Sequence, residues 1–240
     1  MTRADVTLCE RGLFPSRAKA REAIEAGLVS VDGRVVAKPS EPIAAEADIV
    51  ARAPYPWVSR GGVKLAHALD AFGVDPAGRS CLDIGASTGG FTDVLLARGA
   101  AHVTAIDVGH GQLHERLARD PRVTSHEGLD ARALTRAHLA GAPSLIVCDA
   151  SFISLTRVLP SVLPLAAPRA DLIALIKPQF EAGRAAVKKG VVRDKAIHAE
   201  VCARVSAAIE ALGWRVDHVI PSPIEGGEGN REFLVCARGP

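Results

Sequence analysis

The chain has 240 residues, of which 48% are hydrophobic and 23% are charged, so it can form a globular protein with one large domain and one small domain. Its 29 basic and 27 acidic residues give a formal net charge of +2 at pH 7, which excludes nucleic-acid binding driven by overall charge alone. Only a local basic patch could bind a polyanion.

The cysteines are scattered and contain no Cys-x-x-Cys pair, so the sequence predicts neither a disulfide framework nor a metal site. This usage fits a reducing cytoplasm. The longest uncharged stretch, residues 158–168, is much shorter than a membrane span. We therefore predict a cytoplasmic protein without a signal peptide or a membrane partner. The five cysteines are Cys9, Cys81, Cys148, Cys202 and Cys236.

The first predicted elements form a small α+β unit. Residues 16–26 have a good N-cap in Ser16 and a stop signal in Gly27, which predicts a short amphipathic helix. Asp32 and Gly33 then lie between two β-branched runs, a pattern typical of a tight hairpin. Basic residues outnumber acidic ones here, which indicates either an RNA-binding surface or a solvated helix face. They are Arg11, Arg17, Lys19, Arg21, Arg34 and Lys38.

A run rich in proline and aromatic residues at 53–57 predicts an extended connector, so we expect domains at 1–58 and 59–240. Beyond it, apolar strand candidates alternate with helical stretches. This alternation predicts an α/β fold with a doubly wound, mainly parallel, Rossmann-like sheet. The strand candidates are residues 80–84, 102–106, 123–126, 144–148, 172–176, 216–220 and 232–237.

Residues 82–91, Leu-Asp-Ile-Gly-Ala-Ser-Thr-Gly-Gly-Phe, predict a strand, a glycine-rich turn and a helix. The glycines allow close approach to a ligand, and the helix N-terminus adds N–H donors. Asp107 ends the next apolar stretch, where a ribose-binding carboxylate belongs. Asp83 would accept from an ammonium group and repel a pyrophosphate, which favours S-adenosylmethionine over NAD. A purely structural turn is the alternative.

Polar side chains follow other apolar runs, at the strand ends where open α/β sheets bind ligands. Asp149 follows residues 145–148, Lys177 follows residues 172–176, and Glu232 opens the last strand candidate. Lys64 lies on a helix that begins near Gly62. If these four charged residues converge, two cations and two carboxylates form a balanced cluster that tolerates partial burial. Surface ion pairs are the alternative, most plainly for Lys64 and Glu232.

Transfer of a methyl group to a ribose hydroxyl needs a base or a field that favours the alkoxide during in-line attack. A lysine suits this task when a neighbouring cation and desolvation lower its pKa. Competing chemistries lack their usual residues. Residues 149–152 are Asp-Ala-Ser-Phe instead of the Asp/Asn-Pro-Pro-aromatic loop of base-amine methylation, and no Pro-Cys pair offers a nucleophile for pyrimidine carbon-five methylation.

At this point the sequence resembles the TlyA group, also called the haemolysin A family, which are rRNA 2′-O-methyltransferases with an FtsJ-like catalytic domain. The resemblance covers nearly the whole chain. It rests on residues 10–13 with 16–17, 31–33, 58–65, 83–93, 149–155, 176–181 and 190–194.

The resemblance implies an S4-type RNA-binding domain at the N-terminus and a catalytic tetrad of Lys64, Asp149, Lys177 and Glu232, in which Lys177 is the candidate base. Asp130 would lie near the adenine, although its segment has Asp where the family's form has Asn, which keeps an acceptor and loses a donor. The implied cofactor residues are Asp83, Gly85, Ala86, Ser87, Gly89, Gly90, Phe91, Asp107 and Asp130.

The implied reaction is methylation of a cytidine ribose in rRNA or a ribosomal subunit, with 23S rRNA as the main expected substrate and 16S rRNA as a second. The chain resembles the shorter form of the family, which is associated with the large subunit alone. Two other functions stay open: a noncatalytic RNA-binding or ribosome-assembly factor, and a membrane-active haemolysin, for which the sequence offers no amphipathic apolar segment. The sequence does not predict an oligomeric state.

Overall fold

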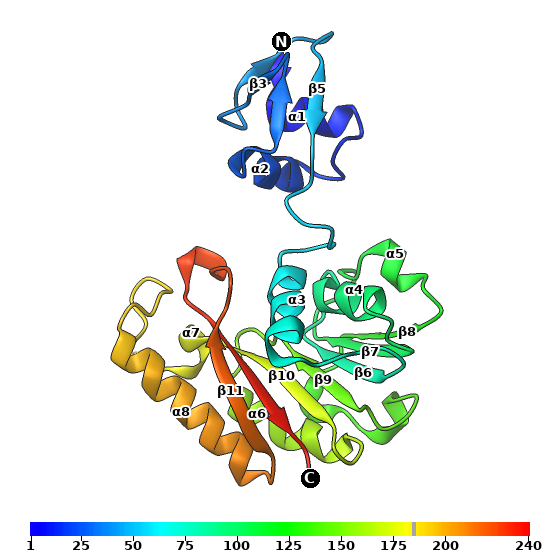
Figure 1. Cartoon of the computed structure of the whole chain (residues 1–240), viewed down its shortest axis with the longest axis vertical. Helices are drawn as coiled ribbons and strands as arrows, with labels where there is room; N and C mark the ends of the chain where they lie inside the picture. Colours follow the sequence, from blue (N-terminus) through cyan, green and yellow to red (C-terminus); the bar gives the residue numbers. More distant parts are fainter. Residues whose placement is uncertain (184–185) are drawn as a thin grey trace. The chain divides into compact units, whose positions relative to one another are not determined.

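The computed structural model of the chain describes residues 1–183 and 186–240. These residues divide into two compact units, Met1–Pro56 and Trp57–Pro240 (Figure 1). Buried hydrophobic residues form one cluster in the first unit and two clusters in the second. Each unit therefore has a hydrophobic core of its own.

The N-terminal unit combines two helices with short antiparallel strands. Strands β3, β2 and β5 form one sheet with β2 in the middle, and β1 pairs with β4. Residues of the helices and of the sheet together form the core, in which Leu8, Ile24 and Val29 are almost completely buried. The elements are β1 (Thr2–Arg3), α1 (Ala4–Glu10), α2 (Arg17–Glu25), β2 (Val29–Val31), β3 (Arg34–Val35), β4 (Pro42–Ile43) and β5 (Ile49–Ala51).

The helix and the hairpin predicted for this unit are confirmed. Ser16 is the N-cap of α2, and its hydroxyl oxygen accepts a hydrogen bond from the backbone N–H of Lys19. Asp32 and Gly33 join β2 to β3 with φ angles of 49° and 76°. Positive φ at both central positions is the backbone of a type I′ turn, whose twist matches that of paired strands.

One carboxylate connects the two helices of this unit. Asp5 of α1 is fully buried and binds the guanidinium groups of Arg3, at 2.9 Å, and Arg17, at 2.9 Å. The hydrogen bond from Arg3 is the main cause that lowers the pKa of Asp5 to about 2; burial opposes the shift and Arg17 adds to it. The ion pairs therefore tie the start of α2 to α1.

The C-terminal unit contains a seven-stranded sheet with the order β11-β12-β10-β9-β6-β7-β8. The five strands from β10 to β8 are parallel, and β12 is antiparallel to both β10 and β11. The doubly wound, mainly parallel sheet is thus confirmed, and every predicted strand ends within one residue of its prediction. The strands are β6 (Ser80–Ile84), β7 (His102–Asp107), β8 (Val123–Glu127), β9 (Leu145–Cys148), β10 (Asp171–Ile176), β11 (Arg215–Pro221) and β12 (Phe233–Arg238).

Helices cover both faces of this sheet. Buried residues of α3 and α4 pack with one set of strand residues, and those of α6 and α8 pack with the other set. Alternate residues of a strand belong to opposite clusters because successive side chains point to opposite faces. The helices are α3 (Gly61–Phe72), α4 (Gly90–Ala97), α5 (Glu115–Ala118), α6 (Leu155–Val162), α7 (Pro178–Glu181) and α8 (Lys195–Ala211), with 3-10 turns η1 (Ala131–Ala133), η2 (Arg136–His138), η3 (Leu163–Leu165) and η5 (Gly227–Gly229).

The strand order reverses between β6 and β9. The chain runs from β6 outward to β7 and β8 and then returns to β9 on the other side of β6. In a doubly wound sheet the ligand crevice lies at such a point, outside the carboxyl ends of the strands. Gly85 follows β6 and Asp149 follows β9, so both residues lie at this crevice.

The helices of this fold are those of a packed globular unit. In the two ranges that the structure describes, no helix combines the length and the apolar character needed to cross a bilayer.

We expect Asp5→Asn to destabilise the N-terminal unit by about 1–2 kcal/mol at pH 7, because both arginine partners are roughly half exposed and screened by solvent. The folded-state pKa of Asp5 is lowered to about 2, so its contribution is present above about pH 4 and is lost as pH falls through about 2. Urea unfolding of the full chain at pH 7 and at pH 2, followed by NMR signals of β2, measures this effect.

The matched control is Glu46→Gln, which changes an exposed carboxylate of the same unit. A destabilisation by Asp5→Asn that stays constant from pH 7 down to pH 2 would contradict the assigned role of the ion pairs.

Candidate active site

The glycine-rich loop between β6 and α4 is held in one shape by backbone hydrogen bonds and by Asp107. The N–H groups of Gly85 and Ala86 both donate to a carbonyl of β7. The N–H of Ser87 donates to Oδ2 of Asp107 at 2.7 Å. Ser87 and Gly89 have φ angles of 47° and 94°, and Gly89 is the N-cap of α4. The loop is therefore fixed before any ligand binds.

Asp107 ends β7 with both carboxylate oxygens engaged by backbone. Besides the contact with Ser87, its Oδ1 accepts the N–H of Gly109 at 2.7 Å. The side chain is half-buried, so each oxygen keeps a lone pair that can accept from a ribose hydroxyl. The adjacent Val108 is 67% exposed and offers an apolar surface next to this carboxylate. A nucleoside fits this combination.

Glu127 at the end of β8 shapes the same region and was missed by the sequence analysis. Its carboxylate accepts the backbone N–H groups of Gly111, Gln112 and Leu113, and these bonds lower its pKa. The side chain thus fixes the loop that follows Asp107. One sequence signal could have identified Glu127: it directly follows the strand candidate 123–126, which is the next candidate after the one that precedes Asp107.

Asp83, which is predicted to meet a ligand amine, lies near the end of β6. Its side chain is fully buried, and its Oδ2 accepts a hydrogen bond from the Thr92 hydroxyl at 2.7 Å. Its Oδ1 has no hydrogen-bond partner among the described residues. Burial raises the pKa of Asp83 to about 7. The carboxyl group therefore links β6 to α4 through Thr92, and its Oδ1 keeps its capacity to accept a hydrogen bond.

Gly90 and Phe91 support the loop from within the protein. Phe91 is 3% exposed and packs in the core cluster with Leu65 and Val94, so it is a core side chain in this structure. A Cβ at Gly90 would overlap the Ser59 hydroxyl, which shows how closely α4 approaches the start of α3. Both residues act on a ligand through the position of the loop.

Asp130 lies at the start of η1 and is occupied by its own neighbour. Its carboxylate caps the N–H of Arg132 and forms an ion pair with the guanidinium of that residue at 2.5 Å. The hydrogen bond from Arg132 lowers the pKa of Asp130 to about 2. An adenine contact would have to share this carboxylate with Arg132.

Lys177 and Asp149 form a buried ion pair at the ends of β10 and β9. The Nζ of Lys177 lies 2.7 Å from Oδ1 of Asp149 and donates to the Asp149 carbonyl oxygen at 3.1 Å and to the Ser151 hydroxyl at 2.7 Å. Lys177 is 8% exposed. Three oxygen atoms therefore fix the amine at the crevice, which is the position required of a group that meets a substrate hydroxyl.

Lys64 and Glu232 form a second buried pair with a distance of 2.5 Å between Nζ and Oε2. A Cβ at Gly226 would overlap the Glu232 carboxylate, so this position needs glycine. Gly61, one helical turn before Lys64 in α3, lies close to Asp149, since a Cβ there would be 3.7 Å from Oδ2 of Asp149. The start of α3 thus lies against Asp149 of the first pair and carries Lys64 of the second pair.

An exposed aromatic side chain lies beside the Lys177 pair. Phe152 is 89% exposed and has a φ of 64°, an uncommon backbone conformation for such a residue. Its ring lies 5.0 Å from the ring of Phe180, and Nζ of Lys177 lies 5.9 Å from the Phe180 ring centroid. Phe152 belongs to the motif at residues 149–155, and the sequence predicted no role for it. Its exposure is the new observation.

Most of the basic residues predicted to bind RNA also hold the N-terminal unit together. Arg11 donates to the carbonyls of Ala45 and Ala47, and Arg17 binds Asp5. Lys19 lies over the ring of Tyr55 and binds Glu22, and Arg34 binds Glu41. Arg21 and Lys38 are exposed and form no ion pair within the ranges described. The contacts position four of the six cations on the surface of the unit.

The residues present fit S-adenosylmethionine. Gly85 accommodates a close approach because a Cβ there would lie 2.9 Å from the Asp149 carbonyl, and Asp107 with Val108 matches an adenosine. Across residues 1–183 and 186–240, no group of three or more His, Cys, Asp or Glu side chains is arranged to hold a metal ion.

Comparison with known families identifies both units. Residues 57–239 match the FtsJ-like methyltransferase family, and residues 2–49 match the S4 domain.

Individual proteins agree with these matches. The chain is 46% identical over 239 residues to the 16S/23S rRNA (cytidine-2′-O)-methyltransferase TlyA of Mycobacterium tuberculosis. This match covers 98% of the chain and 89% of the relative. It is 38% identical over 180 residues to the 23S rRNA (cytidine-2′-O)-methyltransferase TlyA of Campylobacter jejuni, with 74% and 69% covered. A solved structure described as a hemolysin candidate from Streptococcus thermophilus has a TM-score of 0.79 at 40% identity and covers 99% of this chain and 88% of its own.

The buried Asp83 carboxyl predicts an unusual pH dependence of stability. Its folded-state pKa of about 7 lies above the value of an unfolded Asp, so its favourable contribution is complete below about pH 4 and is lost as pH rises through about 7. We expect Asp83→Asn, which keeps an acceptor for Thr92, to gain stability relative to the natural chain by up to about 1.4 kcal/mol per pH unit across this window. Urea unfolding without cofactor at several pH values measures the difference.

Asp120→Asn is the matched control, because Arg122 lowers the pKa of the half-buried Asp120 to about 2 and its contribution is constant above about pH 4. A flat difference between Asp83→Asn and the natural chain from pH 4 to pH 8 would refute the raised pKa.

Proposed function

The chain belongs to the TlyA group of FtsJ-like methyltransferases with an S4 domain, and we propose that it methylates the ribose 2′-hydroxyl of a cytidine in ribosomal RNA. The observation that carries this proposal is the ion pair between the buried Lys177 and the half-buried Asp149 at the crevice beside the glycine-rich loop. Both curated relatives named above act on 23S rRNA by name, so 23S rRNA is the main proposed substrate and 16S rRNA the second.

S-adenosylmethionine supplies an electrophilic methyl group on a sulfonium sulfur when it is bound. In our proposal Asp107 accepts from its ribose hydroxyls, Val108 packs against its adenine, and the loop from Gly85 to Gly89 borders its methionine end. Asp83 and Phe91 act one layer deeper and keep this loop in place.

The proposed role of Lys177 is that of general base. In this role Nζ of Lys177 would accept the proton of the ribose 2′-hydroxyl as its oxygen attacks the methyl group that S-adenosylmethionine would supply, with the sulfur as leaving group. The Asp149 carboxylate, 2.7 Å away, then stabilises the ammonium that forms, and Ser151 keeps the amine pointed at the crevice.

Lys64 and Glu232 are proposed as the supporting pair of the tetrad. Their charges cancel, so they add a fixed dipole beside the reacting groups without an unpaired buried charge. Lys64 supplies a cation near Asp149 through the start of α3, which favours the attacking oxygen as an alkoxide.

Phe152 provides a surface on which the target base can stack. RNA enzymes that modify a nucleotide commonly splay it out of its helix and hold it against an aromatic ring. Phe152 exposes 89% of its side chain directly after Ser151, which contacts the candidate base. A nucleotide stacked there would have its ribose within reach of Lys177.

The N-terminal S4 domain is the proposed site of initial RNA binding. Arg11, Arg17, Lys19, Arg21, Arg34 and Lys38 supply cations for phosphates, and the internal contacts of four of them reduce the entropy lost when RNA binds.

We expect Lys177→Met to reduce methyl transfer to rRNA by at least about 100-fold, the usual contribution of a general base. Binding of S-adenosylmethionine should stay within a factor of about two, because Lys177 touches the acceptor side of the crevice. Incorporation of labelled methyl groups into 23S and 16S rRNA, with nucleotide-resolution mapping, measures the first effect, and calorimetry measures the second. Full activity of Lys177→Met would refute the assigned base, and rRNA binding without any transfer by the natural chain would favour a noncatalytic factor.

Phe152→Ala should lower methyl transfer by about 10-fold or more through loss of one stacked base, worth about 1–3 kcal/mol. Phe152→Trp should retain activity because it keeps an exposed ring. The exposed Val50→Ala in the N-terminal unit is a matched control for loss of an apolar surface side chain. Equal activity of Phe152→Ala and Phe152→Trp would exclude the stacking role.

A further inference from the structure

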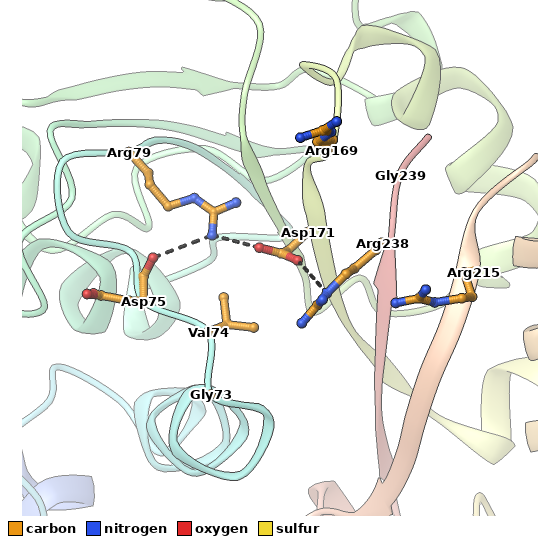
Figure 2. Close-up of a pocket in the computed structure, with 9 residues that line it drawn as sticks. All are labelled: Gly73, Val74, Asp75, Arg79, Arg169, Asp171, Arg215, Arg238 and Gly239. Atoms are coloured by element: carbon orange, nitrogen blue, oxygen red, sulfur yellow. Dashed lines mark hydrogen bonds and ion pairs between the residues drawn. The ribbon is translucent and has the colours of Figure 1, made fainter.

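A second cavity lies at the edge of the sheet opposite the crevice. It has a volume of about 560 Å³, and four of its nine lining residues are arginines, two from strands β11 and β12 and two from the loops before β6 and β10 (Figure 2). Asp171 opens β10 at this edge, whereas Lys177 follows the other end of the same strand, so the two sites are roughly 20 Å apart along β10. The charged residues of the lining are Asp75, Arg79, Arg169, Asp171, Arg215 and Arg238.

Two arginines of this cavity lie directly opposite each other. Arg215 of β11 and Arg238 of β12 are register partners, and Arg238 is also the partner of Asp171 in β10. Like charges at directly opposed positions of a sheet destabilise it. Asp217 and Asp171, which lie against these arginines, offset part of this cost.

Aspartates hold these two arginines by one nitrogen and leave the rest free. Nε of Arg215 binds Asp217 at 2.8 Å, and Nε of Arg238 lies 3.2 Å from Asp217 and 3.6 Å from Asp171. Among the described residues, no hydrogen bond uses the terminal NH₂ groups of Arg215 or Arg238. Each guanidinium is thus oriented in advance while the fork that binds phosphate stays open.

Arg79 and Arg169 have different roles in the cavity. Arg79 is structural, since its guanidinium binds Asp171 at 2.7 Å and the carbonyl oxygen of Asp75 (Figure 2). It also binds two oxygens of Ser144. Arg169, on the loop before β10, is exposed and takes part in no ion pair within the described part of the chain. Three guanidinium groups can therefore reach one ligand.

The lining favours a phosphate over a protein surface. Apart from two glycines, the apolar residue of the lining is Val74, which is almost completely buried. The cavity therefore lacks the hydrophobic centre of a protein–protein interface. Arginine forks match the geometry of phosphate oxygens, and a cationic pocket gains free energy by releasing counterions from RNA.

We propose that Arg169, Arg215 and Arg238 form an accessory site for a backbone phosphate of the RNA substrate, outside the target nucleotide. This proposal rests on the proposed function, because the phosphate belongs to the same RNA whose ribose is methylated. The separation along β10 means that the RNA must extend well beyond the reacting nucleotide to occupy both sites.

The test compares the natural full-length chain with the double variant Arg169→Gln/Arg215→Gln. Filter binding to a 23S rRNA transcript is measured over a range of KCl concentrations. Loss of one or two phosphate contacts should weaken binding and lower the slope of log K against log salt by about 1 to 2. Binding of S-adenosylmethionine should be unchanged because the cofactor residues lie at the other edge. Arg169→Gln alone, which breaks no ion pair of the described residues, should give part of the effect even if the double variant folds poorly.

The control is Arg98→Gln/Arg119→Gln, which removes the same charge from two surface ion pairs elsewhere. Equal salt slopes for the cavity variants and this control would overturn the proposal. A second arm titrates inorganic phosphate and follows the arginine Nε–H signals by NMR. Saturation of the cavity by phosphate without competition against RNA would also overturn it, in favour of a free phosphate ligand. Methyl transfer is measured separately, so an inactive natural chain that binds RNA with the expected slopes would refute the proposed function alone.

Discussion

The site depends on one close approach between two segments of backbone. At Gly85 the loop after β6 lies so near the carbonyl of Asp149, after β9, that a side chain has no room. Because the strand order reverses between these strands, the approach forms one wall of the crevice. Lys177 then reaches Asp149 from the next strand, β10. Gly85 allows the two backbones to come into contact, Asp149 provides the negative charge, and the long side chain of Lys177 reaches that charge from β10.

Burial of charge is balanced in two different ways at this edge. Lys177 with Asp149 and Lys64 with Glu232 are each neutralised by a partner, which limits the desolvation cost that single buried ions would carry. Asp83 has no cationic partner in the described structure and is neutralised by a proton instead, as its pKa of about 7 indicates. The two ion pairs keep both charges at the crevice, whereas the buried Asp83 carboxyl is increasingly protonated as pH falls below about 7.

Regular elements were predictable from the sequence because each has a local cause. The strand candidates are β-branched runs bounded by breakers, and the hairpin is encoded by Asp32 and Gly33. Residue types at strand ends also indicated the lysines and carboxylates. The depth of a side chain was not predictable, since it depends on residues distant in sequence: Phe91 is core because α3 packs on it, and Asp83 is covered because Thr92 closes over it. The exposure of Phe152 and the loop contacts of Glu127 arise in the same way.

A neutral catalytic cluster has a consequence for substrate binding. Two lysines and two carboxylates with matched charges exert little attraction on phosphates at a distance, and the overall net charge of +2 adds little. Attraction for RNA must therefore come from cations outside the crevice. The exposed cations of the S4 domain are one such group, and the half-engaged arginines at the far edge of the sheet are another. Separation of the two tasks lets the tetrad be tuned for proton transfer while phosphate binding is set by residues that never touch the reacting atoms.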